Sequence, residues 1–145
     1  MDIVNRKARF NYFIEEEIEC GIVLTGTEIK SIRQGNCNIG DSYALIRNEE
    51  VFLVNVFISL YKEGNIFNHQ ERRTRKLLLH KKEIKKLNDK IELSGYTLVP
   101  LKIYFKGGIA KVLLGLAKGK KDYDKRETIK QRDIARDTMK TLKNY

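Results

Sequence analysis

The sequence of 145 residues predicts a mainly β fold, a small closed antiparallel barrel with two or three flanking helices and a basic C-terminal tail. Short segments in which apolar and polar residues alternate are bounded by turn residues, which is typical of strands in hairpins. Helical periodicity is confined to two segments, and the apolar pattern stops near Ala117. With 41% hydrophobic residues the chain can bury one core. We therefore expect a barrel over residues 1–117 and a tail over 118–145.

The first elements expected are a strand over residues 10–24 and a short helix of about two turns after it. The strand is predicted by residues at period two: Phe10, Tyr12 and Ile14. At the start of the helix Thr25 and Glu28 have the spacing of a capping box, and Gly35 supplies a left-handed stop.

Two strands and a long loop should follow. Residues 41–61 alternate as a hairpin does, with Asn48 and Glu49 near its turn. Residues 62–76 are polar, and we expect a loop there, either throughout or with a brief strand at Ile66 and Phe67.

The last ordered elements expected are a helix and a second hairpin. The segment 77–95 has lysines between apolar residues spaced three and four apart, namely Ile84, Leu87 and Ile91, and it ends at Gly95. Residues 96–117 alternate on both sides of a glycine turn at 106–108. Pro100 places its strand at an edge or a bulge. The whole order favours a barrel of the OB type, with an α+β sandwich as the alternative.

The charge of the chain is unevenly distributed. Residues 1–60 carry a net charge of −3, residues 61–117 carry +8 and residues 118–145 carry +5, which together make the total of +10. Such a field attracts polyanions, so we expect association with nucleic acid or the ribosome, the alternative being a basic surface without a partner.

Targeting and redox features indicate the cytoplasm. No run approaches the roughly 18 consecutive apolar residues of a membrane span. The N-terminal residues lack the apolar region of a secretory signal. Cys20 and Cys37 are therefore expected to be reduced thiols.

Catalytic arrangements are poorly supported. Glu15, Glu17 and Glu19 share one face of a strand and could hold Mg²⁺ in a nuclease, but a metal site needs ligands from several elements, so we expect a solvated strand face. His69 and His80 fit no zinc spacing. We expect a binding protein without metal or cofactor, and not an enzyme.

Binding features are stronger. Cations cluster on both sides of the apolar run 77–79: Arg72, Arg73, Arg75, Lys76, Lys81 and Lys82. Aromatic residues that could stack on unpaired bases are Tyr12, Phe13, Tyr43, Phe67 and Tyr123. The tail has only a weak apolar stripe, so we expect an arm that is disordered or partly helical when free and orders against RNA phosphates. A general single-strand binder remains an alternative.

Several segments together resemble one family. They are NRKAR (5–9), YFIEEEIECGIVLTGTEIKSIRQG (12–35), DSYALI (41–46), RTRKLLLHKKEI (73–84) and AKGKKDYDKR (117–126). This set is similar to the SsrA-binding protein family, also called small protein B, of bacterial trans-translation. The resemblance implies an OB-fold protein that binds the tRNA-like domain of transfer-messenger RNA and brings that RNA to stalled ribosomes.

The resemblance also implies site residues. Glu19, Leu78 and His80 match positions that serve RNA binding, although some relatives have Asn where this chain has His80. With the neighbouring cations, the expected RNA-binding set is Glu19, Arg73, Arg75, Lys76, Leu78, His80, Lys118, Lys120 and Lys121.

The tail is expected to lie in the empty mRNA channel and decoding centre of the small subunit. Its expected contact residues are Gly119, Tyr123, Asp124, Lys125, Arg126, Lys130 and Arg132, with Tyr at 123 where some relatives have His. The implied partners are transfer-messenger RNA, the stalled 70S ribosome with its small-subunit RNA and, through the charged RNA, elongation factor Tu.

Overall fold

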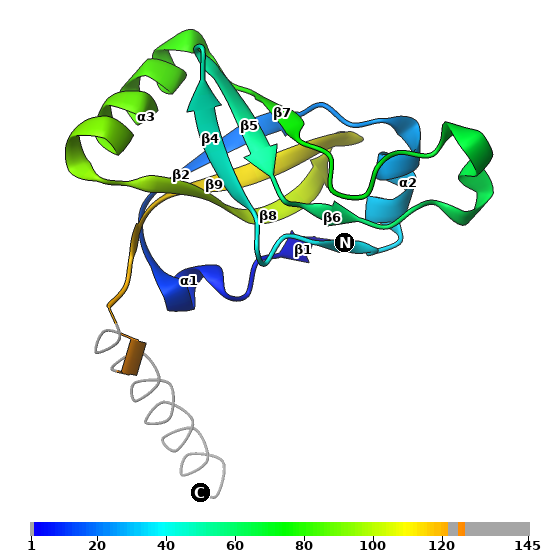
Figure 1. Ribbon diagram of the computed structural model, residues 1–145, viewed down its shortest axis with the longest axis horizontal. Helices are drawn as coiled ribbons and strands as arrows, with labels where there is room; N and C mark the ends of the chain where they lie inside the picture. Colours follow the sequence, from blue (N-terminus) through cyan, green and yellow to red (C-terminus); the bar gives the residue numbers. More distant parts are fainter. Residues whose placement is uncertain (1, 122–124, 127–145) are drawn as a thin grey trace, which may run out of the picture.

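The computed structural model describes residues 2–121 and 125–126 (Figure 1). The helices are α1 (Ala8–Asn11), α2 (Gly26–Arg33), the 3₁₀ helix η1 (Lys62–Phe67) and α3 (Lys81–Ser94). The strands are β1 (Ile3–Val4), β2 (Tyr12–Ile22), β3 (Cys37–Asn38), β4 (Tyr43–Arg47), β5 (Glu50–Val54), β6 (Phe57–Ile58), β7 (Arg75–Leu78), β8 (Thr97–Lys106) and β9 (Ile109–Gly119).

The main sheet is antiparallel and wraps round on itself. Its strand order is β1-β8-β4-β5-β7-β2-β9, and β9 also pairs with β8, so the pairings return to a strand already in the sheet. The contact between β4 and β8 is one residue pair, Ala44 with Leu98. The separate strands β3 and β6 pair with each other. The expected mainly β, OB-like barrel with flanking helices is confirmed.

The local turn and capping predictions are confirmed. Thr25 Oγ1 accepts the Glu28 N–H at 3.4 Å, and the Glu28 carboxylate accepts the Thr25 N–H at 2.9 Å, which starts α2 with a capping box. Asn48 and Glu49 form the β4–β5 turn with φ of 53° and 62°. Both central residues therefore have the positive φ that a tight hairpin requires.

The second hairpin is also confirmed. Gly107 and Gly108 have φ of 59° and 79° and connect β8 to β9. The register between these strands shifts between Pro100 and Lys102, so the proline does lie at a bulge.

Three predicted elements are wrong in detail. Phe10 belongs to α1, and the expected strand begins at Tyr12. Ile66 and Phe67 end the 3₁₀ helix η1, so there is no strand at these two residues. The helix predicted from residue 77 begins at Lys81, because residues 75–78 form strand β7 between β5 and β2. A short apolar run is compatible with a helix or with a strand. Here the pairing with two strands that are distant in the sequence makes it a strand.

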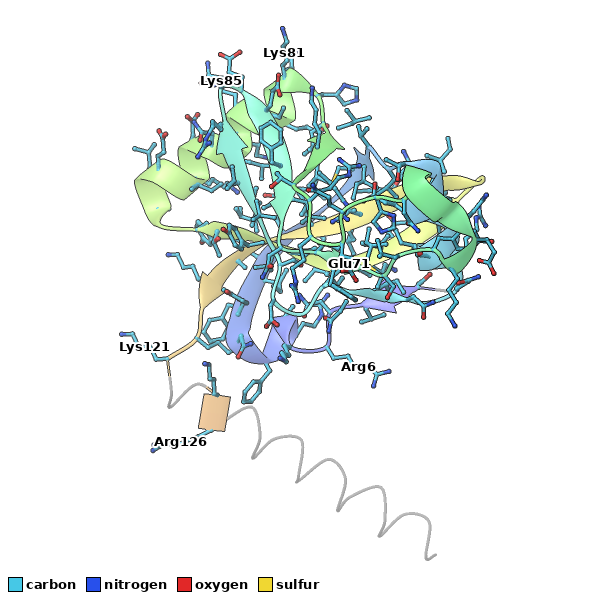
Figure 2. All side chains as sticks on the ribbon, turned by 45° about the vertical axis from the view of Figure 1, so that its right-hand side comes forward. Arg6, Glu71, Lys81, Lys85, Lys121 and Arg126 are labelled. Atoms are coloured by element: carbon cyan, nitrogen blue, oxygen red, sulfur yellow. The ribbon has the colours of Figure 1, made fainter. Side chains whose placement is uncertain are left out.

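The ends of the sheet extend further than expected. Strand β9 continues through Lys118 and Gly119, which pair with Phe13 and Tyr12 of β2. The barrel therefore includes two residues that the sequence assigned to the tail. Helices α1 and α3 lie on opposite sides of the sheet, and Figure 2 shows Lys81 and Lys85 far from Lys121 and Arg126.

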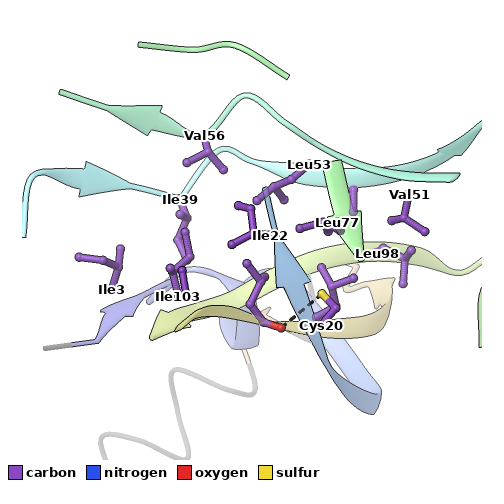
Figure 3. Packing of buried hydrophobic residues seen from close by; sticks show 14 of the residues in the cluster. Ile3, Cys20, Ile22, Ile39, Val51, Leu53, Val56, Leu77, Leu98 and Ile103 are labelled. Atoms are coloured by element: carbon purple, nitrogen blue, oxygen red, sulfur yellow. Dashed lines mark hydrogen bonds between the residues drawn. The ribbon is translucent and has the colours of Figure 1, made fainter. Parts of the chain in front are cut away.

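The core fills the inside of the barrel. Figure 3 shows Ile22, Leu53 and Leu77 gathered between the strands, and each is at least nine-tenths buried. The Cys20 thiol donates to the Val112 carbonyl oxygen at 3.4 Å. Cys20 and Cys37 are both free, and burial raises the pKa of each thiol to about 12, so both thiols stay protonated at neutral pH.

Candidate nucleic-acid interface

Three of the expected RNA-binding residues come together in one pocket. Glu19 comes from β2, Leu78 ends β7 and His80 precedes α3, yet all three line a recess of about 280 Å³. Lys111 of β9 completes its wall with a cation. Residues as far apart in sequence as Glu19 and Lys111 thus form one surface, because β7 pairs with β2 and β2 pairs with β9.

Leu78 lies over a glycine. Gly21 pairs with Leu78 across the two strands, and a Cβ added to Gly21 would lie 3.3 Å from the Leu78 Cβ. The leucine side chain is 53% exposed although it is apolar. Because Gly21 has no side chain, strand β2 leaves space for the Leu78 side chain. The pocket therefore has an apolar contact surface of the kind that a base or ribose face can cover.

His80 is held by its backbone at the start of α3. Its N–H donates to Glu83 Oε1 at 3.3 Å, and its carbonyl accepts the Ile84 N–H at 3.0 Å. The residue is exposed. The helix start thus fixes the place of His80 beside the pocket.

Glu19 is held by two neighbouring side chains. The Tyr104 hydroxyl donates to its Oε2, and Lys106 Nζ lies 3.6 Å from its Oε1. The hydrogen bond from Tyr104, with Lys106 and Lys111 nearby, holds the pKa of Glu19 below its ordinary value. Glu19 is therefore a charged acceptor at neutral pH.

The sequence does not single out Tyr104, Lys106 or Lys111. The signal that could have found them is alternation, because Tyr104 and Lys106 stand two apart in β8 and Lys111 follows the glycine turn. Their closeness to Glu19 depends on the register of three strands, which the sequence does not fix.

Arg75 is a correction. We expected it to bind RNA, but its side chain is fully buried, and its Nε–H donates to Glu28 Oε2. The other four guanidinium N–H groups donate to the carbonyl oxygens of Val56, Arg73, Gln70 and Glu71. All five donors of an arginine are then used, so Arg75 stabilises the fold and has no donor for a ligand.

Arg73 and Lys76 are placed differently. Arg73 donates twice to Glu28 Oε1, at 2.6 and 3.2 Å, and it remains partly exposed. Burial alone would raise the pKa of Glu28, but the hydrogen bonds from Arg73, Thr25 and Arg75 hold it below its ordinary value. Lys76 points outward beside Glu50, at 3.6 Å. Of these three cations Lys76 is the most accessible.

The cations at the end of β9 rest on aromatic rings. Lys118 Nζ lies 4.6 Å from the centre of the Tyr96 ring, and Lys120 Nζ lies 5.0 Å from that of Phe13. The Lys120 N–H also donates to the Asn11 carbonyl at 2.8 Å. The start of the tail is thereby attached to the barrel.

Part of the expected tail set can be located. The Lys125 N–H donates to the Lys121 carbonyl at 3.2 Å, and Arg126 is exposed. Four expected contact residues lie outside the described residues: Tyr123, Asp124, Lys130 and Arg132.

Among the aromatic candidates, Phe13 and Tyr43 offer exposed surface, at 52% and 45%. Tyr12 is partly buried against the small apolar cluster at α1. The Phe67 side chain and the whole of Tyr123 fall outside the described part of the chain.

The acidic side chains of β2 are distributed among separate partners. Glu16 pairs with Lys90 at 3.2 Å in α3, and Glu17 pairs with Arg9 in α1. No group of three or more His, Cys, Asp or Glu among the described residues could hold a metal ion. His69 is buried between Thr27 Oγ1 and the Ile58 carbonyl, each at 2.9 Å. Glu16 and Glu17 thus have different cationic partners.

One further structural observation concerns membranes. Among the described residues, no helix has the length and apolar character needed to span a bilayer.

Comparison with known proteins gives a consistent result. The model of the family described as SmpB protein matches residues 2–144. An SsrA-binding protein of Ligilactobacillus salivarius is 60% identical over 141 residues, covering 97% of this chain and 91% of the relative. The SsrA-binding protein of Enterococcus faecalis is 61% identical over 140 residues, with the same coverage of both chains.

A further relative and a solved structure agree. The SsrA-binding protein of Trichodesmium erythraeum is 59% identical over 142 residues, covering 97% of this chain and 91% of the relative. A solved structure described as "tmRNA-SmpB: a journey to the center of the bacterial ribosome" has 51% identity and a TM-score of 0.70, covering 83% of this chain and 85% of the other. The names describe binding proteins rather than enzymes, and the chain belongs to the SmpB family of SsrA-binding proteins.

Proposed function

We propose that the protein binds transfer-messenger RNA at its tRNA-like domain and takes part in trans-translation on stalled ribosomes. The observation that carries the proposal is the convergence of Glu19, Leu78 and His80 on one pocket. The names of the relatives and of the similar solved structure support it. The pocket offers a charged acceptor, an apolar surface and an imidazole, and Lys111 adds a phosphate partner.

The tail has a separate role in this proposal. Residues 118–145 carry a net charge of +5 and begin with the last two residues of β9, while the pocket borders α3. Lys121 and Arg126 lie far from the α3 side of the molecule (Figure 2). The tail would contact small-subunit RNA in the vacant mRNA channel and decoding centre while the barrel holds the tRNA-like domain. Elongation factor Tu would join through the charged RNA, in the cytoplasm, and the protein itself would need no cofactor.

Binding titrations test the first part. The intact protein is titrated with the tRNA-like domain of transfer-messenger RNA, with an ordinary tRNA and with an unstructured RNA of equal length, at several salt concentrations. A preference for the first RNA that persists at raised salt supports the proposal, because shape-specific contacts depend less on counterion release than phosphate contacts do. Equal affinities that fall together with salt indicate a general single-strand binder.

A truncation tests the second part. Because β9 runs through Gly119 and Lys120 is bonded to Asn11, the chain should end after Lys121 rather than at residue 117. We expect RNA affinity within about threefold of the full chain and loss of tagging in a reconstituted stalled-ribosome assay. An affinity lowered by about a hundredfold would contradict this division of roles, and a variant with the tail order scrambled separates sequence from charge.

A further inference from the structure

The pocket is part of a larger surface on the outer face of the barrel. One row of paired residues crosses four strands, from Leu78 to Gly21 to Lys111 to Tyr104. Glu19 lies two residues before Gly21 on β2, so it is on the same face. Tyr104 therefore reaches Glu19 diagonally across β9.

Tyr104 is itself held on both sides. Lys102 Nζ lies 4.9 Å from the centre of its ring, and its hydroxyl donates to Glu19 Oε2. Burial, with the neighbouring Glu19 carboxylate, raises the pKa of Tyr104 to about 12. The phenol thus keeps its proton at neutral pH and acts as a hydrogen-bond donor.

Both oxygens of Glu19 have a partner within the protein. Oε2 accepts from Tyr104, and Oε1 lies 3.6 Å from Lys106 Nζ. An ionised carboxylate has about four acceptor sites, so about two remain for a ligand. These contacts restrict the rotation of the side chain, which lowers the entropy that a ligand contact would cost.

We propose that Tyr104 is a positioning residue for RNA recognition, which holds the Glu19 carboxylate so that it accepts hydrogen bonds from amino or 2′-hydroxyl groups of the bound RNA. The inference rests on the proposed function and names a part of its site that the sequence does not reveal. Tyr104 acts through Glu19 and need not touch the RNA.

The test is a double-mutant cycle on the full chain with the tRNA-like domain. Tyr104→Phe keeps the ring and its contact with Lys102 while removing the hydroxyl. We expect about a fivefold loss of affinity for Tyr104→Phe and about tenfold for Glu19→Gln. The double variant should bind no more weakly than Glu19→Gln, because the hydroxyl acts only through the carboxylate.

The matched control is Tyr96→Phe. Tyr96 directly precedes β8, and a side-chain hydrogen bond with Glu15 of β2 raises its pKa, which is the same type of contact, but neither residue lines the pocket. This control should leave RNA affinity unchanged. Unaltered affinity of Tyr104→Phe, or additive losses in the double variant, would overturn the proposal.

A measurement without RNA keeps the two proposals separate. The carboxyl carbon of Glu19 is titrated by NMR in the intact protein and in Tyr104→Phe. If Tyr104 positions Glu19, the titration midpoint of Glu19 should be higher in Tyr104→Phe than in the unsubstituted protein. An unchanged midpoint would overturn the proposal. If the midpoint rises but the unsubstituted protein shows no preference for the tRNA-like domain, the proposed function fails while the contact stands.

Discussion

Two carboxylates of this protein are each held by two side chains, but in opposite surroundings. Glu28 receives hydrogen bonds from Arg73 and Arg75 with its side chain fully buried. Glu19 receives one from Tyr104 and lies near Lys106, with 38% of its side chain exposed. In the buried cluster all five donors of Arg75 are used inside the protein, whereas the exposed Glu19 carboxylate keeps acceptor sites open. Burial therefore restricts Glu28 to stabilising the fold, whereas Glu19 is accessible for the RNA contact proposed above.

The largest expected effect comes from breaking the buried cluster. Arg75→Met should lower the free energy of unfolding by about 3–5 kcal/mol, because it leaves Glu28 buried and lacking its Arg75 partner. Urea denaturation measures this change. Arg47→Met, at an exposed position in β4, is the control and should change stability by less than about 0.5 kcal/mol. If Arg75→Met and Arg47→Met lowered stability equally, the buried cluster would not stabilise the fold more than an exposed arginine does.

The pH dependence of stability sharpens the comparison. The pKa of Glu28 is held below its ordinary value in the folded protein. Its ion pairs therefore contribute stability fully above the unfolded pKa of about 4.3, and this contribution is lost as the pH falls through the folded pKa. The stability difference between the unsubstituted protein and Glu28→Gln should shrink as the pH is lowered below about 4.5.

Denaturation curves at several pH values measure this difference. Glu19→Gln is the matched exposed variant, and its difference from the unsubstituted protein should be small throughout, because solvent screens an exposed pair. If the stability difference between the unsubstituted protein and Glu28→Gln stayed constant with pH, the charge of the Glu28 carboxylate would not be what stabilises the cluster.

The two clusters also show what could be predicted from sequence. The capping box at Thr25 and the turn at Gly107 and Gly108 depend on residues adjacent in the chain, and local spacing indicated them. Strand β7 depends on pairing with β5 and β2, and a short apolar run does not show which element it joins.

The residues of the candidate site divide in the same way. A basic cluster at 72–76 is plain in the sequence, but the burial of Arg75 depends on Glu28, which is 47 positions away. Tyr104 cannot be identified from the sequence, because its position opposite Lys111 is set by strand register and by the bulge after Pro100. Only the resemblance to a family indicated Glu19, Leu78 and His80 together.

The smallest expected effect concerns the floor of the pocket. Gly21→Ala places a Cβ 3.3 Å from the Leu78 Cβ and 3.4 Å from its Cδ1, so Leu78 must shift by a few tenths of an ångström. Gly21 does not have a positive φ, and alanine fits its backbone. We expect a stability change below about 1 kcal/mol and about a threefold loss of RNA affinity, a size that corresponds to about 0.7 kcal/mol.

Gly26→Ala is the matched control, since an added Cβ there meets no atom within 4 Å. It should leave RNA affinity unchanged. If Gly21→Ala binds the tRNA-like domain as well as the unsubstituted protein does, the position of Leu78 is not critical, and the charged contacts of Glu19 and Lys111 would have to carry recognition in this pocket. If the RNA affinity falls while the stability is unchanged, the Leu78 side chain itself contributes to recognition, because Gly21→Ala changes no charge and removes no hydrogen bond.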